Sequence, residues 1–130
     1  KMLKNKGYDD AWSFDQESVD LNAYLALECK LLKKFASILG LTFDAPDYCS
    51  QVADYFFDPE MGFFFDKRIK DGSFIQEPGC EAYTPLWTQV ATHEQVERMM
   101  PLMLPELPNM LSGTVIKLFD IRFRMLPSCP

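Results

Sequence analysis

The chain has 130 residues, of which 48% are hydrophobic, 14% aromatic and 25% charged, with a formal net charge of -6 at pH 7. This composition is typical of one soluble globular domain, and the acidic balance argues against a nucleic-acid binder, which needs a basic face. No apolar run approaches the roughly 20 residues that span a bilayer. The single histidine and four scattered cysteines form no zinc-binding pattern, so no metal or other cofactor is predicted.

The first predicted element is a long helix over residues 19–39. Ser18 is placed to cap it, and Asp20 lies in its first turn, where a negative charge complements the helix dipole. Apolar residues recur every three or four positions, and further ones widen this stripe. The pattern therefore predicts a helix about 31 Å long, buried on two sides and ended by Gly40.

A shorter second helix is expected over residues 48–57. Asp44 is its predicted cap, and Pro46 falls in the first turn, where a missing N–H does little harm. The short connection to the first helix predicts a helical hairpin. Residues 58–62, an Asp-Pro-Glu-Met-Gly stretch, are typical of a turn.

A small β-hairpin is predicted next. Its first strand covers residues 63–69, Asp71 and Gly72 form a two-residue hairpin signal, and residues 73–75 return. The three phenylalanines at the start of the first strand should alternate between its two faces. They are expected to anchor the hairpin to the helices, with one ring exposed.

An irregular segment over residues 77–87 precedes a third helix. Thr92 and Gln95 have the spacing of a capping box, which predicts the start of this helix. Pro101 and Pro105 are expected to end or bend it.

The charge balance changes after Glu106. Residues 1–106 carry 10 basic and 18 acidic residues (net -8), whereas residues 107–130 carry 3 basic and 1 acidic (net +2). We therefore expect a domain over 1–106 and a divergent tail over 107–130. One hypothesis for this tail is a frame-shifted or foreign C-terminus.

Four segments, in order, resemble glycoside hydrolase family 63 and its trehalase relatives. They cover residues 18–25, 56–66, 83–87 and 91–99, and the likeness extends over roughly residues 1–106. The family has a six-hairpin (α/α)6 toroid as its catalytic domain. The resemblance implies a mainly α chain that is a partial toroid: a helical hairpin, a small β-hairpin and a further helix.

The resemblance also implies a function. The whole enzyme would be an inverting α-glycosidase of the α-glucosidase type, releasing terminal α-linked glucose from an oligosaccharide or disaccharide. Inversion needs two carboxyl groups about 6.5–9.5 Å apart. In relatives the acid lies upstream of the matching region and the base near the far end of the barrel, so this chain is expected to lack both and to be inactive alone.

Two alternatives stay open. The chain could belong to a trehalase or a mannosylglycerate-type hydrolase, because the same toroid serves several substrates. It could also be a non-catalytic helical interaction module that closes its own core.

Five residues are candidates for contact with a sugar: Trp87, Tyr83, Glu81, Asp20 and Asn22. An aromatic ring can lie against the C–H face of a pyranose while a carboxylate binds its hydroxyl groups. The alternative for the tryptophan is that it simply packs the barrel. The last two residues are candidates because the resemblance places the start of the first helix at the substrate cleft.

Two other groups are interpreted as structural. Asp15, Glu17 and Asp20 lie within six residues of one another, which is typical of a cap and dipole cluster rather than of two opposed catalytic acids. His93 is expected to be an exposed helix residue.

Overall fold

The computed structural model describes residues 2–4 and 12–103 of the chain. The predicted tail over 107–130 and Pro105 lie outside these residues. The described part is mainly α, as predicted, and a short 3-10 turn, η1 (Cys80–Tyr83), leads into the third helix. The four helices are α1 (Val19–Ile38), α2 (Tyr48–Phe56), α3 (Thr84–Trp87) and α4 (His93–Met103).

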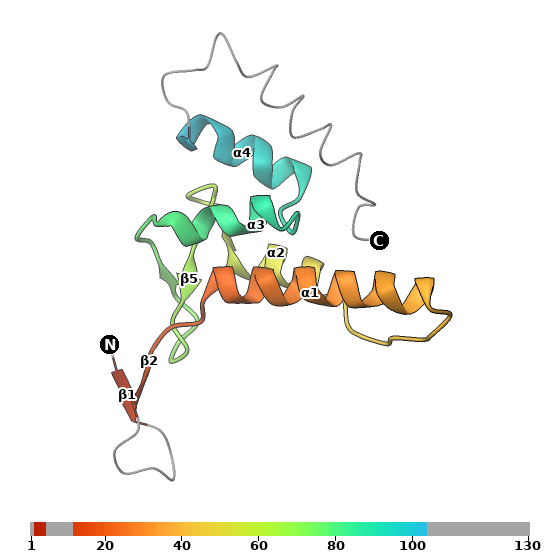
Figure 1. The fold of residues 1–130 in the computed structure, drawn as a ribbon. Helices are drawn as coiled ribbons and strands as arrows, with labels where there is room; N and C mark the ends of the chain where they lie inside the picture. Colours follow the sequence, from red (N-terminus) through yellow and green to blue (C-terminus); the bar gives the residue numbers. More distant parts are fainter. Residues whose placement is uncertain (1, 5–11, 104–130) are drawn as a thin grey trace.

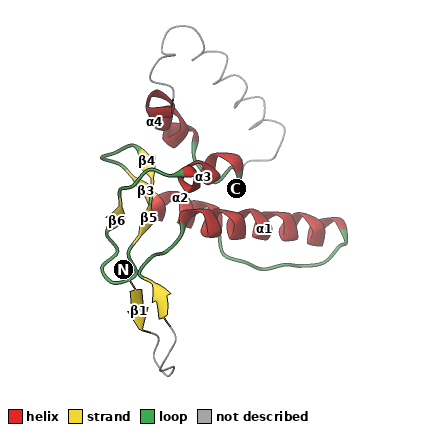
Figure 2. Cartoon of the chain, turned by 60° about the vertical axis from the view of Figure 1, so that its left-hand side comes forward, coloured by secondary structure: helices red, strands yellow, loops and turns green. Residues whose placement is uncertain are grey.

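The helices are arranged around α1. This helix packs against α2 on one side and against η1 and α3 on another. Figure 1 shows α1 in the lower part of the molecule, with α3 and then α4 stacked above it, and Figure 2 shows the same order of layers from another side. None of the described helices is long and apolar enough to cross a membrane.

The strands are short and pair as three antiparallel hairpins. One was predicted in part, and the hairpin nearest the N-terminus, which projects away from the helices in Figures 1 and 2, was not predicted. The pairs are β1 (Met2–Lys4) with β2 (Trp12–Phe14), β3 (Phe57–Asp58) with β4 (Phe63–Phe64), and β5 (Asp66–Lys67) with β6 (Phe74–Ile75).

The C-terminal end of α1 confirms the predicted stop at Gly40, which has a φ of 68°. Its N–H donates to the Ser37 carbonyl at 3.3 Å, and the next N–H, of Leu41, donates to the Ala36 carbonyl at 2.8 Å. These two bonds form a Schellman motif, which needs a residue that tolerates the left-handed conformation.

The N-terminal end of α1 begins where predicted, but the predicted side-chain cap is wrong. Ser18 is the N-cap residue, yet its hydroxyl donates to the Asp20 carboxylate and makes no cap bond. The Val19 N–H instead donates to Oδ1 of Asp66, at 2.7 Å, and Gln16 Nε2 donates to the other oxygen of that carboxylate. The acceptor for the orphan N–H therefore comes from β5, 47 residues away.

The predicted cap of α2 is also wrong. Asp47, and not Asp44, accepts the Ser50 N–H at 3.2 Å, and it also accepts the Ser50 hydroxyl at 2.6 Å. These bonds from Ser50 hold the pKa of Asp47 below its ordinary value. Pro46 precedes the helix rather than lying in its first turn. The N-cap residue is Asp47, directly before the first helical residue, Tyr48.

The turn over residues 58–62 is confirmed. Gly62 has a φ of 68°, and its N–H donates to the Asp58 carbonyl at 2.8 Å. The next hairpin has a longer loop than the predicted two-residue turn: Lys67 pairs with Phe74, and the Arg68 N–H donates to the Ser73 carbonyl at 2.9 Å.

The core is built from buried side chains of α1, α2, η1, α3, α4 and the β3–β4 hairpin. All three phenylalanines at 63–65 are buried, so the predicted exposed ring is wrong. The Phe65 N–H donates to the Phe56 carbonyl at 3.0 Å, which continues the register of the β3–β4 pair by one residue. All three rings belong to the core cluster. The largest fully buried side chains include Phe64 and Met99.

The prediction that α1 is buried on two sides does not hold for the described residues. Its buried side chains are the small ones: Val19, Ala23 and Ala26. Larger apolar side chains along the helix are exposed. They are Leu21, Tyr24, Leu25, Leu31, Leu32, Phe35 and Ile38.

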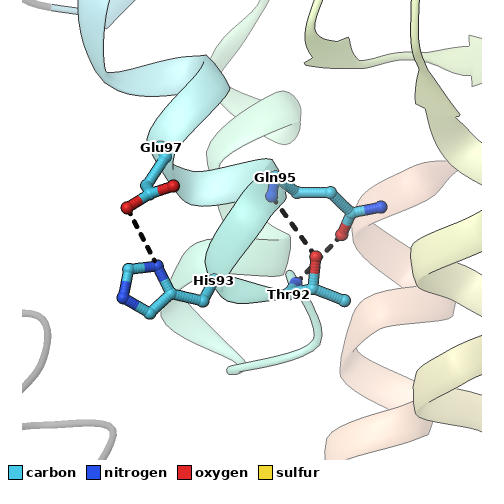
Figure 3. Close-up of polar contacts among 4 residues, drawn as sticks. All are labelled: Thr92, His93, Gln95 and Glu97. Atoms are coloured by element: carbon cyan, nitrogen blue, oxygen red, sulfur yellow. Dashed lines mark hydrogen bonds and ion pairs between the residues drawn. The ribbon is translucent and has the colours of Figure 1, made fainter.

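The predicted capping box of the third helix is confirmed in α4. The Thr92 N–H donates to Oε1 of Gln95 at 2.9 Å, and the Gln95 N–H donates to the Thr92 hydroxyl at 3.3 Å (Figure 3). The Gln95 amide also donates to the Ala53 carbonyl at 2.8 Å, which ties α4 to α2. Pro101 lies inside the helix and does not end it.

Candidate functional site

The candidate sugar-contact residues lie on elements that touch one another. Asp20 and Asn22 are in the first turn of α1, Glu81 and Tyr83 are in η1, and Trp87 ends α3. Since α1 packs against both η1 and α3, segments about 60 residues apart in the sequence become neighbours.

The most exposed candidate is Trp87, with 62% of its surface exposed. Its ring and that of Tyr24 are in edge-to-face contact, with ring centroids 5.9 Å apart and an interplanar angle of 66°. Tyr83 is seated against the core, because its ring contacts the buried Phe63 at 5.5 Å and 88°. Two of the predicted aromatic residues are thus anchored at one edge and open elsewhere.

Tyr24 was missed by the sequence analysis. It lies one turn after Asp20 on α1, so the two side chains share a face of the helix. That spacing was the available signal. The helical periodicity assigns Tyr24 to the apolar stripe that was predicted to be buried, whereas 49% of its surface is exposed.

Asn22 lies on another side of α1, facing α2. Its side-chain amide donates to the Ser18 carbonyl at 2.7 Å. It borders an open cavity of about 650 Å³ between the two helices. The lining residues are Asn22, Tyr48, Gln51, Val52, Asp54, Tyr55 and Phe56. The structure therefore does not bring Asn22 together with Trp87.

Tyr55, which lines this cavity, belongs to a polar cluster with Glu17 and Lys67. The Tyr55 hydroxyl donates to Oε2 of Glu17 at 2.6 Å, and this bond raises the pKa of Tyr55. The Lys67 ammonium lies 4.1 Å from the centroid of the same ring and 4.5 Å from that of Phe74. The cluster joins α2, the loop before α1 and the β5–β6 hairpin.

The loop before α1 is held by that hairpin. Glu17 and Lys67 exchange two backbone hydrogen bonds, at 2.7 and 3.1 Å. The buried carboxylate of Asp15 accepts the Lys70 N–H at 3.0 Å. The interpretation of Asp15, Glu17 and Asp20 as one cap cluster is therefore wrong in part, because only Asp20 lies in the helix and the other two bind the hairpin and Tyr55.

The buried carboxylates of the described residues, those of Asp15, Asp58 and Asp66, all accept backbone N–H groups. Burial by itself would raise the pKa of Asp58. Hydrogen bonds from Gln76, Met61 and Glu60 outweigh it and hold that pKa below its ordinary value. The three carboxylates act as acceptors that fix turns and a helix start. A general acid at neutral pH needs a raised pKa, whereas the pKa of Asp58 is lowered.

Other candidates for chemistry are structural as well. His93 is exposed, as expected, and its Nδ1 lies 3.6 Å from Oε1 of Glu97, one turn further along α4 (Figure 3). Within residues 2–4 and 12–103, no three His, Cys, Asp or Glu side chains gather closely enough to hold a metal ion.

Comparison with known proteins gives a family model and relatives that include two trehalases. Residues 1–107 match the model of the mannosylglycerate hydrolase MGH1-like glycoside hydrolase domain. The chain is 24% identical over 139 residues to a probable trehalase of Eremothecium gossypii, covering 88% of this chain and 18% of the relative. It is 35% identical over 63 residues to the cytosolic neutral trehalase of Saccharomyces cerevisiae, covering 48% of this chain and 8% of the relative.

The chain therefore spans less than a fifth of the length of these relatives. Its predicted membership of a glycoside hydrolase family is confirmed, and the narrower assignment to family 63 stays a prediction. The matched domain accounts for most of the sequence, and the chain belongs to the MGH1-like glycoside hydrolase domain family.

Proposed function

We propose that the chain is part of the (α/α)6 catalytic toroid of an inverting α-glycosidase, of the α-glucosidase type in family 63. The observation that carries this proposal is the glycoside hydrolase domain match over residues 1–107. The order of elements supports it, because a helical hairpin, a β-hairpin and a further helix follow one another, which is the order that the resemblance to family 63 implies. The substrate would be an oligosaccharide or disaccharide with a terminal α-linked glucose.

The proposal includes that this chain has no hydrolytic activity alone. Inversion requires an acid and a base about 6.5–9.5 Å apart across the sugar, and the buried carboxylates of the described residues are engaged with backbone N–H groups. The chain also covers only 18% of the probable trehalase. The missing sequence would supply both groups.

The test is an assay of the purified chain with aryl α-glucosides and α-linked disaccharides. We expect no release of product above a buffer blank. Turnover that increases in proportion to the chain and co-purifies with it would overturn the proposal of an inactive part.

The sugar contacts are part of the same proposal. The indole of Trp87 and the phenol of Tyr83 would lie against C–H faces, Glu81 would accept hydroxyl groups, and Asp20 and Asn22 would orient groups at the start of α1. The exposure of the two aromatic rings supports this, because neither is enclosed by the described core.

A second candidate substrate class is trehalose or a mannosylglycerate-type glycoside. The similarity to two trehalases and to the mannosylglycerate hydrolase MGH1-like domain favours it. A panel of α-glucosyl disaccharides, trehalose and mannosylglycerate would discriminate, applied to the polypeptide translated from the whole surrounding reading frame. Preference for trehalose or mannosylglycerate over maltose-type linkages would replace the α-glucosidase assignment.

The exposed apolar side chains of α1 count against a self-contained interaction module.

The boundary between a domain over 1–106 and a divergent tail also remains a proposal. It rests on the reversed charge balance. The nucleotide sequence around the codon for Glu106 tests the frame-shift origin of the tail, and an intact frame without an alternative continuation would exclude that origin.

A further inference from the structure

The geometry points to an aromatic corner, made by Tyr24 of α1 and Trp87 of α3, that binds one pyranose ring through its C–H face. This inference rests on the proposed function, because that function supplies the class of ligand. It adds Tyr24, which was not among the five predicted sugar contacts, and it names the part of the ligand that the corner contacts.

The two rings form an open angle rather than a closed stack. Their planes are inclined by 66° and their centroids lie 5.9 Å apart. This is the edge-to-face arrangement that aromatic pairs prefer, so each ring holds the other in place. Both side chains are largely exposed, at 49% and 62%, although they come from elements that pack against each other.

Such a corner suits a sugar better than it suits a flat apolar surface. An indole face offers the large apolar area that the axial C–H groups of a pyranose can cover, and the second ring limits the direction from which the sugar approaches. The phenol hydroxyl and the indole N–H lie at ring edges and are available to sugar hydroxyl groups. Asp20 lies one turn before Tyr24 on α1, and Glu81 lies in η1, which contacts both α1 and α3. Both carboxylates are therefore candidate acceptors for sugar hydroxyl groups.

The competing occupant is a helix from the rest of a longer protein, which would bury the same rings by packing. The two occupants can be distinguished by the affinity of the chain for a free sugar. A pyranose binds the chain as it stands, reversibly and in competition with other pyranoses, whereas a packing surface has no affinity for a free sugar.

The experiment uses the full 130-residue chain with Trp12→Phe, so that Trp87 is its single tryptophan. Trp12 is exposed on β2, away from α1 and α3. The fluorescence of Trp87 and its quenching by acrylamide are followed while trehalose or methyl α-D-glucopyranoside is added. We expect saturable protection from the quencher, and sorbitol, an open-chain polyol, should give none.

Substitutions then separate the corner from general effects. Tyr24→Leu keeps an apolar side chain but removes the ring, so it should weaken the apparent affinity about two- to tenfold, the loss expected for one aromatic contact. Tyr24→Phe should retain the affinity. Phe35→Leu is the matched control, since Phe35 is an exposed aromatic residue further along the same helix. Circular dichroism checks that each variant keeps the helix content of the parent chain.

Equilibrium dialysis with labelled trehalose distinguishes binding at the Tyr24–Trp87 corner from binding of sugar elsewhere in the domain. Sugar binding without any change at Trp87, or a Tyr24→Leu variant with unchanged affinity, would overturn the corner and leave the proposed sugar contacts elsewhere in the domain intact. If neither method detects binding, the corner and the proposed sugar contacts of this chain are both wrong.

Discussion

The start of α1 depends on Asp66, whose carboxylate accepts the N–H of the fully buried Val19. A buried N–H that loses its partner costs about 1–3 kcal/mol. We therefore expect Asp66→Ala to destabilise the chain by about that amount. Ser18→Ala should change the free energy of unfolding by less than about 0.5 kcal/mol, because the Ser18 hydroxyl does not cap the helix.

Urea unfolding of the two variants, followed by circular dichroism, measures this difference. Asp66→Asn is the conservative control: its amide oxygen can still accept the Val19 N–H, so part of the stability should return. If Ser18→Ala proved the more damaging change, the cap assignment would have to be reversed.

The carboxylate of Asp58 contributes stability that depends on pH. Hydrogen bonds hold its pKa in the folded protein below its ordinary value, so its ionised form is favoured by folding. The contribution is therefore complete above the unfolded pKa of about 3.9 and is lost as the pH falls through the lower folded pKa. Chain stability should decrease below about pH 4, and this decrease should be smaller in Asp58→Asn.

Unfolding curves at a series of pH values between neutral and strongly acidic check this. Asp44→Asn serves as the control, because Asp44 does not cap α2 and lies in the exposed loop before it. An acid-induced decrease that is the same in the parent chain and in Asp58→Asn would show that this carboxylate does not carry the effect.

At the scale of elements, the β5–β6 hairpin acts as a support for α1. Gly72 in its loop has a φ of 69°, and a Cβ added there would meet nothing within 4 Å. Gly72→Ala therefore costs only backbone strain, about 1–2 kcal/mol. Because β5 carries Asp66, we expect the loosened hairpin also to lower the hydrogen-exchange protection of the Val19 N–H.

Gly40→Ala is the matched comparison, since Gly40 has nearly the same φ and equally open surroundings. It should fray the other end of α1, at Leu39 and Leu41, and leave Val19 protected. Equal loss of protection at Val19 in both variants would mean that the hairpin does not hold the helix start separately.

The elements that the sequence predicted well are those decided by neighbours along the chain. Gly40, the turn before Gly62 and the Thr92–Gln95 capping box each depend on residues within about five positions, and each was placed correctly. The bond from Val19 to Asp66 joins residues 47 positions apart. No local pattern encodes that pairing, and the serine next to the helix was the more conventional choice.

For the candidate site, the sequence indicated residue types but not the contacts that tertiary packing creates. Residue type alone nominated Trp87 and Tyr83, because aromatic rings can lie against the C–H face of a sugar, and their contact with a sugar stays a proposal. The contact between Trp87 and Tyr24 required the packing of α1 against α3. The same helical periodicity that located α1 assigned Tyr24 to its core, since spacing identifies a face but not whether that face is covered.

At the scale of the whole molecule, the described residues leave much of α1 uncovered. Its largest apolar side chains are exposed, and at the end of the helix Ile38 and Leu39 are each 70% exposed. Monomeric soluble proteins rarely expose large contiguous apolar patches, and these exposed side chains follow one another along a single helix. This fits a part of a toroid whose neighbouring helices lie in sequence beyond this chain, and the coverage of the relatives, 18% and 8%, agrees with that proposal.

The exposed face of α1 predicts that the isolated chain self-associates and binds a hydrophobic dye. Replacing Leu25 and Ile38 together by lysine should lower both signals, with little loss of helix content, because neither side chain belongs to the core. Phe14→Lys is the control, since Phe14 is equally exposed but lies on β2, away from α1. Analytical ultracentrifugation and dye fluorescence measure the outcome. A chain that stays monomeric at high concentration, binds no dye and melts sharply would favour a self-contained module over a part of a larger ring.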